Sequence, residues 1–180
     1  MARRILLLLV CTGLFLFKGY AQQAAFCNAI NAIVKDAPNK FRNIRGKLIE
    51  ANANATFWES GINVPGAIGA RFVYSMGLFY EAAVLQTKNK DEVKAVYDKY
   101  KGLLSSCLTP QGYAMTLSDN FYPGLTDYKK VVFMLEEKEE IPPTANDKVK
   151  PPSAPAHITL GATYSKDVDK YTVVMYIFEH

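Results

Sequence analysis

Histidine and cysteine are scarce in this sequence, and their scarcity restricts the chemistry that the protein can perform. The 180 residues include two His, which are His157 and His180, and three Cys. Neither His lies beside a second metal ligand or a candidate nucleophile, so the sequence gives no support for a His-based triad. No Cys-x-x-Cys or His-x-x-x-His pair marks a zinc site. We therefore predict no catalytic histidine and no metal site.

Motifs for nucleotide binding and for serine nucleophiles are also lacking. The segment 66–69 has two Gly but not the spacing of a dinucleotide-binding turn, and no Gly-Lys-Ser/Thr sequence ends a phosphate loop. No Gly-x-Ser-x-Gly sequence is present after residue 21. We predict no cofactor.

Acidic residues give a weaker indication of catalysis. The run 136–140 is typical of a solvated strand end, and Asp167 and Asp169 indicate a turn because the further ligands of a calcium loop are missing. Three other carboxylates, Glu50, Glu59 and Glu81, could serve a hydrolase in principle. No sequence pattern places two of them in one cleft.

The main apolar run, residues 5–17, is too short to span a bilayer as a helix. It has about 13 residues, whereas a membrane-spanning helix needs about 20. Arg3 and Arg4 precede this run, and the small residue Ala21 follows it at a position suited to signal peptidase. We predict that residues 1–21 are a cleaved signal peptide and that the mature chain, without a stable membrane anchor, is exported to the periplasm or the extracellular space. An uncleaved anchor is the alternative.

Basic residues exceed acidic residues only slightly. The full chain has 21 Lys and Arg against 17 Asp and Glu, which gives a formal net charge of +4. Arg3, Arg4 and Lys18 lie in the predicted signal peptide, so the mature chain has a net charge of about +1. This near-neutral balance predicts that nucleic acid is not a partner.

Two cysteines remain in the mature chain, Cys27 and Cys107. An even number of cysteines in an oxidising compartment predicts a disulfide between them. The alternative is a pair of buried reduced thiols.

Two segments have the periodicity of amphipathic helices. In residues 23–37 the apolar positions recur at helical spacing, and Pro38 ends the pattern. Residues 91–108 show a longer apolar stripe, and Asn89 with Glu92 resembles a capping box at its start. Cys27 and Cys107 lie on the apolar faces of these helices, so a disulfide would join the helices through a shared core.

Other segments have the alternation or the apolar content of strands. Arg71 and Glu81 are expected to face each other in a hairpin that turns near residues 75–77. The last segment is apolar on both faces and is therefore expected to be a central strand. The candidate strands are residues 41–50, 56–60, 68–76, 79–87, 113–117, 128–137, 157–164 and 171–179.

The segment 139–156 is rich in proline and cannot form a ladder strand. Only about 24 residues follow it, which is too few for a separate domain. We interpret it as a long loop between two strands of one sheet. The sequence thus predicts one α+β domain over residues 22–180, in the order α-β-β-β-α-β-β-β, with both helices on one face of a mainly antiparallel sheet.

Aromatic residues form 12% of the chain, and several fall near predicted loops or strand ends. Trp58, Phe121 and Tyr122 are the candidates for a binding surface, which we place on the sheet face or edge away from the helices. The alternative is that such aromatics fold back to cover the sheet.

Taken together, these features favour an exported, non-catalytic binding domain whose ligand is a peptide or a protein. An edge strand could bind an extended peptide, or it could pair with a second copy to form a homodimer. The alternative is a secreted hydrolase that acts on envelope or extracellular polymers through carboxylates.

Overall fold

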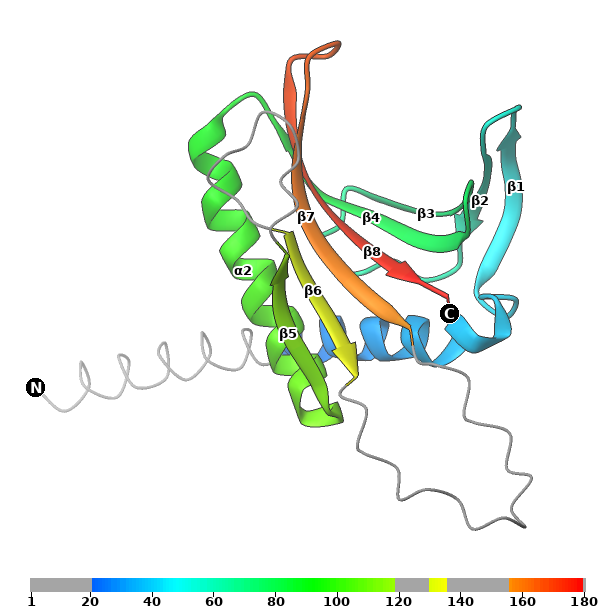
Figure 1. The fold of residues 1–180 in the computed structure, drawn as a ribbon, viewed down its shortest axis with the longest axis horizontal. Coiled ribbons are helices and arrows are strands. Elements are labelled where there is room, and N and C mark those ends of the chain that lie inside the picture. Colours follow the sequence, from blue (N-terminus) through cyan, green and yellow to red (C-terminus); the bar gives the residue numbers. More distant parts are fainter. Residues whose placement is uncertain (1–20, 119–129, 136–155, 180) are drawn as a thin grey trace, which may run out of the picture.

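The computed structural model describes residues 21–118, 130–135 and 156–179 (Figure 1). The predicted signal peptide, apart from Ala21, and most of the Pro-rich segment lie outside these residues. The elements are a helix over residues 21–36, here called the N-terminal helix, η1 (Ala37–Asn39), β1 (Arg45–Ala51), β2 (Thr56–Ser60), β3 (Gly69–Tyr74), β4 (Leu78–Thr87), α2 (Lys90–Leu108), η2 (Thr109–Gln111), β5 (Tyr113–Ser118), β6 (Lys130–Leu135), β7 (His157–Ser165) and β8 (Lys170–Phe178).

The eight strands form one antiparallel sheet in the order β1-β2-β3-β4-β8-β7-β6-β5. This arrangement confirms the predicted α+β class. Four strands follow each helix, rather than the three of the predicted order, because all eight candidate segments pair in the sheet. β6 and β7 are neighbours, so the Pro-rich segment connects two strands of the same sheet, as expected.

The strand order divides the domain into two similar halves. Each half is a helix followed by four antiparallel strands in sequence order, and the halves meet where β4 pairs with β8. β8 lies between β4 and β7, which confirms that the last strand is central. The sequence shows no repeat that would have revealed this arrangement.

Both helices contribute to a single core against the sheet. α2 contacts β4, β5, β7 and β8, and Figure 1 shows it beside β5 to β7, with the N-terminal helix (blue) crossing the lower part of the view. The helix side chains that face the sheet are fully buried because the apolar positions recur on one helical face. They include Phe26, Ile30, Ile33, Val93 and Leu104.

A side-chain N-cap marks the start of α2, and a glycine with positive φ marks the end of the helical region that follows it. The Asn89 side chain accepts a hydrogen bond from the Asp91 backbone N–H at 3.0 Å, and the Asn89 side-chain amide donates to Glu92 at 3.3 Å. This N-cap satisfies one of the backbone donors that a helix leaves unpaired. After η2, the chain leaves the helical region at Gly112, whose φ of 87° is accessible to glycine without strain.

The first strand starts later than the sequence predicted. Lys40 and Phe41 have φ values of 57° and 54°, and the buried Phe41 ring packs against Phe72 with centroids 5.1 Å apart. The buried Asp36 carboxylate holds this turn, because it accepts hydrogen bonds from the Asn39 side chain and from both the backbone and the side chain of Asn43. The predicted strand 41–50 is therefore a turn as far as residue 44.

The predicted hairpin and disulfide are both present. Arg71 on β3 lies opposite Glu81 on β4, and the Arg71 Nη2 is 2.9 Å from the Glu81 Oε1. Cys27 and Cys107 are bonded, with their Cα atoms 5.2 Å apart. The disulfide therefore joins the N-terminal helix to the end of α2, and it links the two halves of the domain.

Candidate functional site

The register of the central strands defines the two faces of the sheet. Tyr80 on β4 lies opposite Ile177 on β8, and both side chains are fully buried in the core that the helices cover. Successive strand residues point to opposite faces, so the neighbouring pair, Phe79 and Phe178, points away from this core. We call the face that carries Phe79 and Phe178 the distal face.

Four aromatic side chains gather on the distal face, and we call them the aromatic patch: Phe79, His157, Tyr176 and Phe178. The His157 and Phe178 rings are stacked with centroids 4.4 Å apart and planes at 10°. Phe79 lies 5.2 Å from Phe178 and 5.7 Å from Tyr176, the second contact being edge-on at 76°. All four residues are partly exposed. Rings in such mutual contact form a preorganised apolar surface.

Charged residues border the aromatic patch in the same cross-strand row. Glu81 lies opposite Tyr176 on one side and Arg71 on the other, and Arg71 in turn lies opposite Glu59 on β2. The Arg71 guanidinium also stacks over the Phe57 ring, 4.7 Å from the ring centroid. The distal face therefore combines an aromatic area with an ordered arginine–carboxylate pair.

Thr159 on β7 lies opposite Tyr176 and continues this row beyond the aromatic patch. Its side chain is 0% exposed, and among the described residues its hydroxyl has no hydrogen-bond partner. Burying a hydroxyl without a partner costs free energy. The buried hydroxyl of Thr159 is therefore expected to lower the stability of the fold next to the aromatic patch.

Of the three residues predicted to form the binding surface, only Trp58 lies within the described residues. Trp58 on β2 lies opposite the buried Phe72, so it lies on the helix-facing side of the sheet and packs against the core. The Arg45 guanidinium covers its ring at 4.7 Å from the centroid. Its neighbour Phe57, not Trp58, points to the distal face. Phe121 and Tyr122 lie outside the described residues.

The sequence did not reveal the aromatic patch, because its residues come from β4, β7 and β8. Strand pairing brings these distant segments together. The available signal was the second apolar face of the last strand, which carries Val174, Tyr176 and Phe178.

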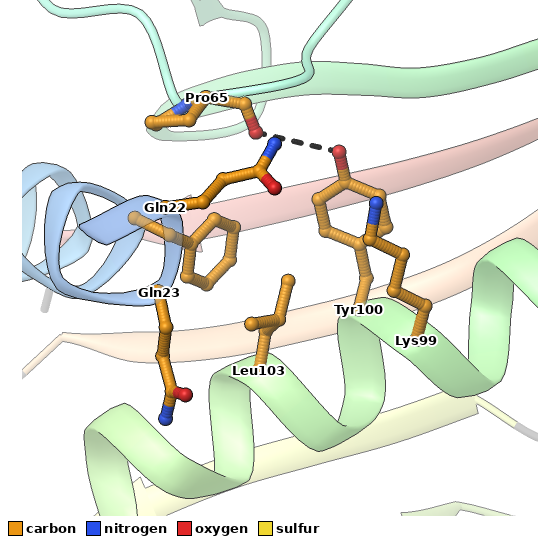
Figure 2. A pocket seen from close by; sticks show the side chains of 7 residues that line it. Gln22, Gln23, Pro65, Lys99, Tyr100 and Leu103 are labelled. Carbon is orange, nitrogen blue, oxygen red and sulfur yellow. Dashed lines mark hydrogen bonds between the residues drawn. The ribbon is translucent and has the colours of Figure 1, made fainter. Parts of the chain in front are cut away.

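None of the candidate carboxylates Glu50, Glu59 and Glu81 lines the small pocket between the N-terminal helix and α2. Glu81 is paired with Arg71, the exposed Glu50 accepts a hydrogen bond from the Asn52 side chain, and Glu59 is exposed on β2. The pocket has a volume of about 110 Å³, well below the roughly 300 Å³ of small-ligand sites. It is lined by Gln22, Gln23, Phe26, Pro65, Lys99, Tyr100 and Leu103. Figure 2 shows this lining from close by.

The acidic segment before the last strand is a turn, as the sequence indicated. Asp169 has a φ of 49° within the β7–β8 connection. The Tyr164 hydroxyl donates to its carboxylate at 2.9 Å, and this bond, followed by the nearby Lys88 ammonium, holds the pKa of Asp169 below its usual range. Within the described ranges, no three His, Cys, Asp or Glu side chains converge in a way that could hold a metal ion.

Comparisons with protein-family models, with curated proteins and with solved structures found no match. In the part of the chain that the structure describes, neither helix is both long and apolar enough to cross a membrane.

Proposed function

We propose that the protein is exported after removal of residues 1–21 and acts as a non-catalytic domain that binds a protein or peptide through the distal face of its sheet. The aromatic patch carries this proposal. The disulfide between Cys27 and Cys107 supports export, because such bonds persist in oxidising compartments.

The composition of the distal face favours recognition of a polypeptide. Aromatic residues and arginine are enriched at protein interfaces, where they provide large contact areas and directed hydrogen bonds. Phe79, Tyr176 and Phe178 supply the aromatic area, and Arg71 with Glu81 supplies charges at its border. These side chains hold one another in place. Ordering them when a partner binds should therefore cost little free energy.

The test compares the exported protein with a Tyr176→Ser variant. Each is captured with its partners from the exported fraction, and the partners are quantified by mass spectrometry. We expect at least one polypeptide that wild type recovers to fall about tenfold in the variant, which corresponds to the loss of about 1.4 kcal/mol at an interface residue.

Leu48→Ser is the matched control, because Leu48 is 57% exposed on the edge strand β1 and lies on the helix-facing side of the sheet with Trp58. This variant should recover the same partners as wild type. Loss of partners in Leu48→Ser but not in Tyr176→Ser would place binding at the sheet edge and refute the proposal. Equal recovery by all three proteins would also refute it.

A further inference from the structure

Gln22 becomes the first residue of the mature chain if the signal peptide is cleaved after Ala21. The inference that follows rests on this proposed cleavage. An N-terminal glutamine has a free α-amine and, in the same side chain, an amide carbon that this amine can reach. No other described glutamine has this arrangement, because the nitrogens of Gln23, Gln86 and Gln111 are peptide nitrogens.

The structure holds the new terminus in a defined place. The Gln23 side chain donates a hydrogen bond to the Ser106 hydroxyl on α2 at 3.0 Å. Phe26 is buried, with its ring 5.7 Å from that of Tyr100, and Cys27 is bonded to Cys107. These anchors all follow the cleavage point, so the helix keeps its position on α2 when the preceding residues are removed.

A protonated amine is electrostatically unfavourable at this position. The first turn of a helix carries a partial positive charge because its backbone N–H groups are unpaired. The α-amine is largely protonated near neutral pH. Lys99, a second cation, lines the same small pocket as Gln22. A neutral terminus would remove this repulsion.

We propose that Gln22 is converted to pyroglutamate in the mature protein. The α-amine nitrogen attacks the side-chain amide carbon Cδ, a bond forms between them, and the Cδ–Nε2 bond breaks. The protonated amine loses one proton to solvent and a second to the departing group, which leaves as ammonia, and the third hydrogen remains as the lactam N–H. The product is a five-membered lactam without a positive charge, and the step requires no oxidant or other co-reactant.

The fold leaves this reaction free to occur. Gln22 is exposed, and Figure 2 shows its side chain extending from the N-terminal helix toward Pro65. Ring closure joins N, Cα, Cβ, Cγ and Cδ of one residue, so it requires only side-chain rotation and leaves the backbone after Cα in its helical conformation. The helix therefore does not need to unwind.

The test is a mass measurement of the N-terminal peptide of the exported protein. Free amines are labelled at cell lysis, before digestion, so that cyclisation during handling is distinguished from cyclisation in the cell. We expect a peptide that begins at residue 22, lacks the mass of one ammonia and carries no label on its terminus. The intact protein should resist an aminopeptidase.

The other outcomes separate the modification from the proposed cleavage. A labelled peptide that begins at Gln22 with its full mass would overturn the modification and leave the cleavage in place. A terminus at any other residue would overturn both. Gln22→Asn is the matched control, because its amide could close only a strained four-membered ring; this variant should retain a labelled amine, and an unlabelled terminus in it would point to another blocking group.

Discussion

Cys27 on the N-terminal helix is bonded to Cys107 on α2, across 80 positions of the chain. The bond joins the two helix-and-four-strand halves on the side of the sheet that holds the core. Replacing both cysteines by alanine should lower the free energy of unfolding by up to about 4.5 kcal/mol, because the unfolded chain gains the freedom of a long loop. Urea denaturation of oxidised, reduced and doubly substituted protein measures this effect. Equal midpoints for the oxidised and reduced forms would contradict it.

Among the polar residues of the turn before β1, Asp36 should be the one whose substitution lowers the free energy of unfolding most. Asp36→Ala removes three hydrogen bonds from Asn39 and Asn43, and we expect a loss of about 2 kcal/mol in the free energy of unfolding. Asp98→Ala is the control, since Asp98 is exposed and pairs with Lys94 on the same helix at the surface. A comparable loss in the two variants would argue against a special role for the Asp36 turn.

Alkaline pH should destabilise the protein through its buried tyrosines. Burial raises the pKa of Tyr80 from 10.0 to about 12. Below pH 10 the Tyr80 hydroxyl keeps its proton in both the folded and the unfolded state. Between pH 10 and 12 it loses the proton in the unfolded state but largely keeps it in the folded state. Stability should therefore fall as the pH rises through this window, by about 2–3 kcal/mol for Tyr80.

Tyr80→Phe isolates this contribution, because phenylalanine keeps the ring and has no ionisable group. Thermal unfolding at several pH values should show a shallower fall for the variant between pH 10 and 12. Burial also raises the pKa of Tyr97 to about 12. Tyr97 should therefore preserve part of the pH dependence of stability in this variant. An unchanged slope in Tyr80→Phe would show that Tyr80 does not contribute.

Thr159→Val should stabilise the protein. The variant removes a buried hydroxyl that has no partner among the described residues and replaces it by a methyl group of similar size, with an expected gain of about 1 kcal/mol. Thr163→Val provides the control, because Thr163 lies on the same face of β7 but is partly exposed. If Thr159→Val proves less stable than wild type, the hydroxyl has a partner in the folded state.

The sequence predicted the features that local patterns determine. The spacing of Phe26, Ile30 and Ile33 marked the N-terminal helix, and an acid in an apolar run marked the pairing of Glu81 with Arg71. The two apolar faces of the last strand indicated its central place. In each case the information lies within one element or in two strands joined by a short turn.

The remaining features depend on long-range pairing. Trp58 and Phe57 are adjacent, and only the register of β2 with β3 decides which of them points away from the helices. The aromatic patch combines Phe79 on β4 with residues of β7 and β8 that lie at least 78 positions further along the chain. The late start of β1 depends on the turn at Lys40 and Phe41, whose positive φ values have no signature in the sequence.

The most direct test of the proposed function is site-specific photo-crosslinking in the exported protein. A photoreactive aromatic residue is placed either at position 176, in the aromatic patch, or at position 58, on the helix-facing side of the sheet. The account predicts a crosslink to another polypeptide from position 176 and little or none from position 58. No crosslink from position 176, or equal crosslinking from both positions, would contradict binding through the distal face.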